Sequence, residues 1–492
     1  MIQTTPRPTR AASRWRWVGL AALLTAEAMN LLDATIVQVA APTMHADLGG
    51  SATDIQWFSA AYTLPFAVLL ISGGRLGDIF GRRRMFRIGV TMFLLASVAC
   101  ACAPSAGTLI VFRTVQGAAA AAVIPQTIGL IKAMFDGDEV AKALGTIGPV
   151  MGLAGVAGPI LGGVLTHADL FGSSWRAVFL VNAPLAVVVL ALTGRITENL
   201  APRRPGLDPV GTVLVMAAAA LIVYPLIGTG GTGSHGQGGW TWPFVAAGVG
   251  ILALFAAHQR RTSRSGGRPL VETSLFHGKA FPAALATSTL FFAVMNGLML
   301  VIVVHLQLGV DADSLTAGLT LLPWSAGLGI ASYAAGSRFV PRYGDRVMFA
   351  GLTTLIIGIA AAVAAYHASD PTRYPTLLLP ALAVCGLGIG LFSPAFFTSA
   401  LHNLQPQEIG SAAGLLNAVQ QLGATLGIAV LGTLFFHHDT PPTPGNATSA
   451  VELVFITAGV IILAAVATAT LMAATRPSTE PEDHTARQSL PN

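Results

Sequence analysis

The sequence contains fourteen apolar runs separated by short polar segments. A helix needs about 20 apolar residues to cross the hydrocarbon core of a membrane, and each run is close to that length. Charged residues make up only 10% of the chain and the mean hydropathy is +0.68, so polar groups could not cover the surface of a soluble domain. We therefore predict an all-α polytopic membrane protein. The predicted spans are 17–41, 53–72, 85–103, 107–131, 142–165, 175–194, 209–229, 240–258, 280–305, 314–338, 346–366, 374–400, 409–436 and 450–474.

The distribution of lysine and arginine predicts the orientation of these spans. Of the 27 Lys and Arg, 24 lie in the two tails or in every second loop, Arg176 and Arg373 lie in the remaining loops, and Arg113 lies inside a span. Basic residues accumulate in cytoplasmic loops. We therefore expect a multi-pass protein with both termini in the cytoplasm. The alanine- and glycine-rich composition is typical of a high-GC genome, and we expect a bacterial plasma (inner) membrane.

A charged, glycine-rich segment, GGRLGDIFGRRRMF at 73–86, joins the second and third spans. Its glycines allow two helix ends to approach closely and turn tightly. The acid in its middle, Asp78, could meet a helix N-terminus, where free N–H groups and the helix dipole favour an anion. We interpret the segment as a conformational latch on the inner face, the alternative being an ordinary basic loop. The latch residues are Gly74, Asp78, Gly81, Arg82 and Arg83.

A fainter copy of this segment, GSRFVPRYGDR at 336–346, joins the tenth and eleventh spans and aligns Gly344 with Gly81. A loop repeated after the second span of each six predicts two related six-helix bundles, a known transporter plan. Spans seven and eight, flanked by polar linkers, are then an inserted pair. The predicted division is an N-terminal six-helix bundle at 1–194, a linker with two additional helices at 195–274, a C-terminal six-helix bundle at 275–475 and a cytoplasmic tail at 476–492.

Ionisable residues inside spans are costly and usually functional. The first span contains Glu27 and Asp33, and the fourth contains Arg113. At about 1.5 Å per residue, Arg113 lies at a depth between the two acids, as does Asn30. Burial favours the neutral form of an unpaired acid, whereas a nearby arginine favours the ionised form of a paired one. We expect Asp33, Glu27 and Arg113 to couple proton movement, with Asp33 as the coupling site. A structural ion pair joining the two spans is the alternative.

The fifth span is rich in glycine and proline, which permit close helix contacts and bends. It either slides against its neighbour or forms a tight static crossing. The residues concerned are Gly148, Pro149, Gly155, Gly158, Pro159 and Gly162. Candidate substrate-binding residues are less specific predictions, because most aromatic residues in spans serve packing. They are Asn30, Gln116, Phe292, Met295, Asn296, Asn417, Gln420 and Gln421.

These segments together make the chain resemble the major facilitator superfamily, specifically its fourteen-span drug:proton antiporter family. The family's loop signature Gly-x-Leu-x-Asp-x-x-Gly-Arg-Arg matches the segment that begins at Gly74. One departure is Ile79, where the family often has a base. Further matches are LLDATIVQVAAP at 31–42, RTVQGAAAAAVIP at 113–125, GPVMGLAGVAGPILGG at 148–163, WRAVFLVNAP at 175–184 and LNAVQQLGATLG at 416–427.

The resemblance implies export of hydrophobic drugs, antibiotics or natural products, driven by inward proton flow and without a cofactor. A dedicated exporter or importer of one metabolite on the same fold is the alternative, and a membrane-embedded non-transport protein is a third reading. The sequence has no phosphate-binding GxxxxGK[ST] motif, no catalytic constellation, no CxxC or metal-ligand spacing and no clustered basic face for nucleic acid. We therefore expect a non-enzymatic, monomeric transporter whose partners are a small hydrophobic molecule, protons and lipid.

Overall fold

The computed structural model describes residues 10–194, 196, 198, 206–228, 238–267, 269–402, 404–405, 408–439 and 443–474. Within these ranges the chain is helical with no strand. Fourteen helical segments are long and apolar enough to cross a membrane, which confirms the predicted number of spans. The predicted tail 476–492 and most of the predicted connection between the inserted helices lie outside the described residues.

The first six spans form the N-terminal half, residues 10–194. Helices α1, α2, α3, α4, α6 and α8 pack against one another there, and α7 leads into α8. The elements are α1 (Arg10–Leu48), α2 (Thr53–Phe80), α3 (Arg82–Ala101), α4 (Ala106–Met134), α5 (Asp138–Gly145), α6 (Ile147–His167), η1 (Leu170–Gly172), η2 (Ser174–Arg176), α7 (Ala177–Leu180) and α8 (Asn182–Thr193).

The last six spans form the C-terminal half, residues 280–474, and two inserted helices precede it. The inserted helices are α9 (Pro209–Gly228) and α10 (Gly238–Arg264), followed by η3 (Thr273–Phe276). The C-terminal half contains α11 (Ala280–Val304), the π-helical η4 (His305–Gly309), α12 (Ser314–Thr320), α13 (Leu322–Ala334), the π-helical η5 (Ala335–Phe339), α14 (Val340–Tyr343), α15 (Arg346–Ala368), α16 (Leu378–Leu401), α17 (Ile409–His438) and α18 (Pro444–Ala474).

Several helices are longer than the apolar runs that predict them. The first span is predicted at 17–41 but α1 continues to Leu48, and the last is predicted from 450 but α18 begins at Pro444. Hydropathy marks only the part of a helix that suits hydrocarbon, whereas backbone hydrogen bonding continues the helix into the interface. The sixth span is interrupted instead, because η2, α7 and α8 follow one another within it.

The two related loops share a backbone feature. Gly81, between α2 and α3, has a φ of 101°, and Gly344, between α14 and α15, has a φ of 56°. Side chains other than glycine rarely adopt such values. The glycine that the sequence repeat aligns therefore meets the same conformational requirement in both halves.

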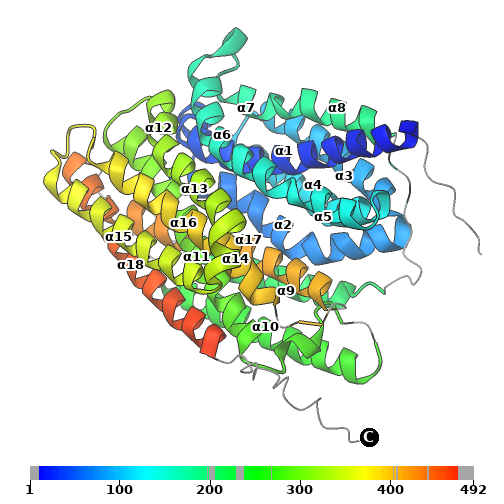
Figure 1. Cartoon of the computed structure of the whole chain (residues 1–492). Helices are drawn as coiled ribbons and strands as arrows, with labels where there is room; N and C mark the ends of the chain where they lie inside the picture. The colour runs from blue at the N-terminus through cyan, green and yellow to red at the C-terminus, as the bar shows by residue number, and fades with distance from the viewer. Residues whose placement is uncertain are drawn as a thin grey trace, which may run out of the picture.

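The two halves contact each other on the side away from the chain ends, which we call the far face; the side that holds Arg10 and Ala474 is the terminal face. Near the middle of α2 and α17, the hydroxyls of Thr63 and Thr425 lie 2.7 Å apart, and further contacts lie toward the far face. The Gln307 amide donates to the carbonyl of Val39 at 2.8 Å. Figure 1 shows α12 of the C-terminal half beside α6 of the N-terminal half, and these two helices are in contact.

Glycine positions show that this contact does not continue to the terminal face. A Cβ on Gly163, near the far end of α6, would lie 2.6 Å from the carbonyl oxygen of Ser314, so α12 is packed directly against it. Cβ atoms on Gly148 and Gly152, near the other end of α6, would meet no atom within 4 Å. The same holds for Gly414 in α17. The halves are therefore closed on the far side and separated toward the terminal face.

The inserted helices lie on one flank of the molecule. In Figure 1 they are the green helices α9 and α10, and α9 contacts both α2 and α17. Most of α10 faces away from the protein, and its side chains Trp242, Val249 and Leu254 are exposed. An apolar helix with one exposed side suits contact with lipid, so the insertion adds a lipid-facing layer to the flank formed by α2 and α17.

Candidate functional site

An ion pair between α1 and α4 lies at the centre of the N-terminal half. Arg113 Nη1 is 2.5 Å from Asp33 Oδ2, and both side chains are at most 1% exposed. Both residues lie within membrane-spanning helices, so neither charged group is exposed to water. Charges this deeply buried require partners for every polar atom, because an isolated buried charge is strongly unfavourable.

Neighbouring side chains supply those partners for Asp33. Its Oδ1 accepts hydrogen bonds from the Gln116 amide at 2.8 Å and from the Asn182 amide at 2.7 Å. Gln116 also donates to the Ser97 hydroxyl at 2.9 Å. Helices α1, α3, α4 and α8 therefore each contribute one or more members of a single buried network. Such a network fixes the relative positions of the four helices as long as Asp33 is ionised.

Arg113 is held by three further contacts. Its Nε donates to the carbonyl of Phe58 at 2.9 Å, and its Nη1 donates to Gln116 Oε1 at 2.7 Å. The guanidinium carbon lies 4.3 Å from the centre of the Tyr62 ring, a favourable cation–π distance. The buried Tyr62 hydroxyl makes no hydrogen bond to the described part of the protein.

Glu27 is separate from this ion pair. It lies two turns from Asp33 on α1, is 9% exposed, and is next to the Thr127 hydroxyl on α4. Within the described residues no cation is paired with it. Asn30, one turn away, is also 9% exposed, and its amide nitrogen has no described hydrogen-bond partner. A buried carboxylate beside unpaired polar groups is a typical feature of a ligand or proton site.

The arrangement gives two acids unequal access to one arginine. Asp33 accepts hydrogen bonds from Arg113, Gln116 and Asn182, so its ionised form is fully compensated. Glu27 has no such set of partners, and no cation is paired with it among the described residues.

The latch segment, residues 73–86, contacts residues of the N-terminal half and of the linkers around the inserted helices. Asp78 forms an ion pair with Arg82 at 2.6 Å, one turn along the chain. The Glu198 carboxylate accepts hydrogen bonds from the backbone N–H groups of Arg83 at 3.0 Å and Arg84 at 3.2 Å. Glu198 therefore occupies the α3 N-terminus, the kind of position that the sequence suggests for Asp78. A Cβ on Gly81 would lie 2.8 Å from Glu198, so this position also requires glycine sterically.

The glycine- and proline-rich helix α6 packs against α1. Cβ atoms added at Gly158 and Gly162 would lie 1.9 Å from Thr35 Oγ1 and 2.9 Å from the Ile36 carbonyl oxygen. The carbonyl oxygen of Pro159 would be 2.6 Å from a Cβ at Gly318 in α12. By contrast, Gly155 has only Leu31 nearby, at 3.7 Å, and Gly148 is open. The predicted helix thus makes tight contacts with both halves near the far face and loose contacts near the terminal face, where Pro149 lies.

The predicted substrate-binding residues occupy different environments. Gln116 is fully buried in the network around Asp33. Asn296 accepts a hydrogen bond from Gln38 of the N-terminal half at 3.4 Å, so it lies between the halves. Phe292 is 5% exposed and packs edge-on against Phe291, while Met295 is partly buried.

Three polar predictions lie on α17. Asn417, Gln420 and Gln421 are partly exposed, and no hydrogen bond involves their side chains within the described residues. Gln421 is three residues after Ala418 and four before Thr425, and these three share one helix face. Thr425 bonds to Thr63 in α2, which places this face toward the N-terminal half.

Sequence reasoning misses several members of the site. Asn182 lies within the quoted segment WRAVFLVNAP but is not predicted as a site residue, and Ser97 and Tyr62 are not singled out. A single polar residue in an apolar run could have indicated each of them. The sequence could not show that these side chains lie around one ion pair, because that depends on how the helices are rotated about their axes.

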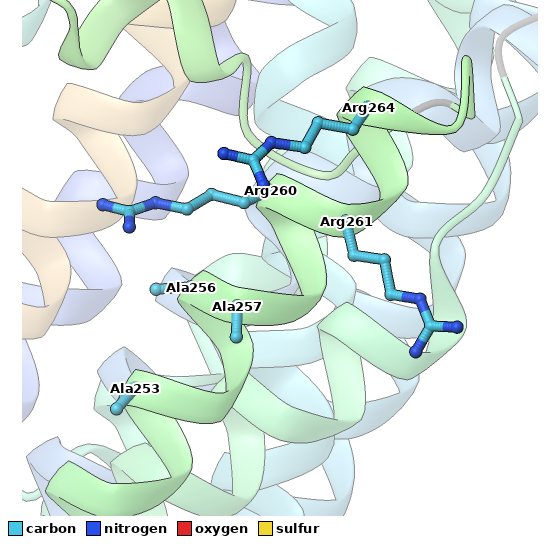
Figure 2. A pocket seen from close by; sticks show the side chains of 6 residues that line it. All are labelled: Ala253, Ala256, Ala257, Arg260, Arg261 and Arg264. Atoms are coloured by element: carbon cyan, nitrogen blue, oxygen red, sulfur yellow. The ribbon is translucent and has the colours of Figure 1, made fainter.

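A separate recess lies on the outward side of α10 (Figure 2). It shares no residue with the buried network, and the residues that line it are exposed. Figure 2 shows the Arg260 and Arg261 side chains pointing in different directions, so they do not converge on one ligand position. We do not assign this recess to the site. Its lining residues are Ala253, Ala256, Ala257, Arg260, Arg261 and Arg264.

Residues 23–428 match the Major Facilitator Superfamily. The chain belongs to this superfamily. The match includes Glu27, Asp33, Arg113, the latch segment and most of α17. The superfamily resemblance predicted from the sequence motifs is thereby confirmed.

Several curated relatives within the superfamily bear the names of antibiotic or drug transporters. The chain is 43% identical over 425 residues to a probable actinorhodin transporter of Streptomyces coelicolor, covering 86% of this chain and 72% of the relative. It is 36% identical to the puromycin resistance protein pur8 of Streptomyces alboniger, covering 85% and 82%. It is 31% identical to the multidrug efflux pump LfrA of Mycolicibacterium smegmatis, covering 91% and 86%.

Solved structures of superfamily transporters have the same fold. A bacterial homologue of the human lysosomal transporter Spinster, described as inward-facing and unoccupied, aligns with a TM-score of 0.66 at 18% identity, covering 95% of this chain and 99% of that structure. A bacterial homologue of the human peptide transporters PepT1 and PepT2 aligns with a TM-score of 0.64 at 15% identity, covering 94% and 100%. At these identities the likeness concerns the fold alone.

Proposed function

We propose that this protein is a monomeric proton-coupled antiporter that exports hydrophobic drugs, antibiotics or related natural products across a bacterial plasma membrane. The terminal face is its cytoplasmic side, in agreement with the distribution of lysine and arginine. The conformation described here is then inward-facing. The names of the relatives support export of antibiotics, and membership of the superfamily supports transport instead of enzymatic catalysis.

The observation that carries the proposal is the unequal pairing of two buried acids with one arginine. Asp33 is paired with Arg113, whereas Glu27 is uncompensated and lies close to the unpaired amide of Asn30. We assign proton coupling to Asp33. A proton that arrives from outside neutralises Asp33, which frees Arg113 to interact with Glu27.

Substrate and proton then affect each other through this arginine. A cationic substrate that enters from the cytoplasm is attracted to ionised Glu27, which leaves Arg113 to Asp33 and favours proton release. Proton uptake by Asp33 reverses the preference and favours release of the substrate. Polar groups on α17, including Gln421, are suited to contact the substrate from the opposite half.

The domain division and the remaining site residues belong to the same proposal. The bundles at 1–194 and 275–475 move relative to each other, the segment 73–86 stabilises one of the two end conformations, and α6 provides a smooth surface for the movement. No cofactor is required, because the proton gradient supplies the driving force.

The test is a transport assay on purified protein in liposomes with an imposed pH gradient, using fluorescent hydrophobic cations and neutral antibiotics. Transport that collapses when a proton uncoupler is added supports the proposal. Transport that persists unchanged with the uncoupler contradicts proton coupling. Movement of one polar metabolite, with none of the hydrophobic compounds transported, would favour the dedicated metabolite transporter instead.

A further inference from the structure

Arg75 in the segment 73–86 contacts both linkers of the inserted helix pair. Its guanidinium donates to the carbonyl of Gly206 at 3.1 Å, just before α9. It also donates to the carbonyls of Pro269 and, at 3.1 Å, Leu270, just after α10. One side chain at the end of α2 thus holds the two ends of an insertion that is about sixty residues long. An arginine suits this role because its planar donors can reach several carbonyls at once.

The two inserted helices are also joined to each other at this end. Asp208 accepts hydrogen bonds from the backbone N–H of Gly211 at 2.8 Å and the Gln259 amide at 2.7 Å, and its Oδ1 lies 3.0 Å from the His258 ring. Gln259 in turn accepts from the N–H of Val271 at 3.2 Å. The start of α9, the end of α10 and the following linker therefore form one hydrogen-bonded unit.

The inserted helix pair is attached differently to the two halves. Toward the terminal face, the hydroxyls of Ser72 in α2 and Thr212 in α9 lie 2.8 Å apart. Toward the far face, the Thr433 hydroxyl of α17 donates to the carbonyl of Leu226 in α9 at 2.7 Å. The halves separate toward the terminal face and meet at the far face, so α9 bonds to α17 where the halves already touch. Where the halves separate, the hydrogen bond that α9 makes to another helix is to α2.

The other flank, between α6 and α13, has no such cover. Val156 of α6 lies 3.4 Å from a Cβ built on Gly329 of α13, but Gly152 and Gly336 closer to the terminal face have open space around them. Large apolar side chains on this flank are exposed: Leu153 is 70% exposed and Ile330 is 67% exposed. Exposed apolar side chains suit direct contact with lipid, so this flank lacks the covering layer that α9 and α10 form on the other.

We propose that Arg75 is a positioning residue that fastens the inserted pair to the N-terminal half as one moving body. The pair covers the flank between α2 and α17 throughout the cycle. This rests on the proposed transport function, but its structural part can be tested without transport. Movement with the N-terminal half predicts that contacts between α9 and α2 persist while contacts between α2 and α17 break.

Two matched disulfides distinguish these contacts. In a variant with Cys100, Cys102 and Cys385 replaced by alanine, one protein carries Ser72→Cys with Thr212→Cys, and the other carries Thr63→Cys with Thr425→Cys. Both pairs start from α2, and their hydroxyl oxygens are 2.8 Å and 2.7 Å apart. Loss of free thiols, measured with a maleimide mass tag, reports how completely each disulfide forms.

The oxidised α2–α9 pair is expected to keep most of its transport activity, whereas the oxidised α2–α17 pair is expected to stop transport until a reductant is added. Equal inhibition by both disulfides would overturn the proposal, because α9 would then have to move relative to α2. If the reduced proteins transport no compound, the proposed function fails. The fastening by Arg75 is then still decided by the next measurement.

The role of Arg75 is tested by disulfide formation and photolabelling in membranes. Arg75→Ala is expected to slow formation of the α2–α9 disulfide about tenfold, since charged hydrogen bonds to the linkers are lost. The α2–α17 disulfide should form at its original rate.

A hydrophobic diazirine dissolved in the bilayer should label α2 and α17 more strongly in Arg75→Ala, and label α6 and α13 equally in both proteins. Arg87→Ala, an exposed arginine on α3, controls for loss of one charge. Unchanged rates and labelling in Arg75→Ala would contradict the fastening role.

Discussion

Arg113 lies 2.5 Å from Asp33 in α1 and leaves Glu27, on the same helix, without a cationic partner among the described residues. The two acids lie only six residues apart in the sequence, but only Asp33 is paired with the arginine. Asp33 also accepts two amide hydrogen bonds, so side chains from two other helices, α4 and α8, compensate its charge. The difference between the acids supplies the first two predictions.

Asp33→Asn should abolish transport driven by a pH gradient while substrate binding remains measurable. The amide cannot exchange a proton, and it leaves Arg113 without a buried counter-charge, which costs up to about 3–5 kcal/mol of stability. Transport and binding should therefore be compared at equal amounts of folded protein in liposomes. Asn182→Ala is the control, because it removes one hydrogen bond from Asp33 without changing any charge. Undiminished gradient-driven transport by Asp33→Asn would move the coupling role to Glu27 or another group.

Glu27→Gln should weaken export of cationic substrates by at least about tenfold and affect neutral substrates less, because a buried carboxylate attracts a cation strongly over a few ångströms. The measurement is the ratio of apparent KM values for a cationic and a neutral substrate. Asn30→Asp offers a reciprocal variant that adds an acid one turn away. Equal loss for both substrate types would indicate that Glu27 has a structural or proton-transfer role.

Asp78→Asn should reduce transport strongly while the protein level and substrate binding are retained, and Asp78→Glu should be milder. The ion pair of Asp78 with Arg82 is partly exposed, so its loss should destabilise the fold by less than about 1 kcal/mol. Glu198→Gln is the comparison, because Glu198 accepts hydrogen bonds at the N-terminus of α3. If Asp78→Asn lowers folded protein as much as it lowers transport, the segment serves only to anchor the fold.

The structural role of Asp208 should be sensitive to acid. Burial opposes its ionisation, but hydrogen bonds from Gln259, Gly211 and His258 outweigh this and lower the pKa of Asp208 below its ordinary value. A lowered pKa stabilises the folded state above the ordinary carboxylate range, and this contribution disappears as the pH falls through the folded pKa. The melting temperature in lipid nanodiscs should therefore decrease below about pH 4 more steeply for the unmodified protein than for Asp208→Asn. Parallel pH curves would contradict this role.

Topology can be tested with single cysteines and a membrane-impermeant maleimide on intact cells. A cysteine at Asp439, beyond the end of α17, should be labelled from outside, and one at Ser265, after α10, should be protected until the cells are opened. A reporter at Ser234, which lies outside the described residues, is expected to read external as well. Labelling of Ser265→Cys on intact cells would reverse the proposed orientation.

The sequence by itself determined the number of spans, their approximate positions and the presence of two acids and one arginine within them. These features are local, because insertion of a helix depends on the summed transfer free energy of about 20 consecutive residues. The repeated loop was likewise readable, since Gly81 and Gly344 each need a backbone conformation that glycine favours. Helix ends were less readable, because hydrogen bonding extends α1 and α18 beyond their apolar cores.

Only the tertiary structure decided which acid pairs with Arg113. Depth along the membrane normal places Arg113 between Glu27 and Asp33 and does not distinguish them. The rotation of α4 against α1 does, and it also brings Gln116 to Asp33, while the packing of α8 brings Asn182 there. The same reason explains Arg75, whose three carbonyl partners are more than 130 residues away and whose sequence context does not indicate a contact with the inserted helices. Such pairings depend on how helices from distant parts of the chain pack, and no local pattern of hydropathy or charge records that packing.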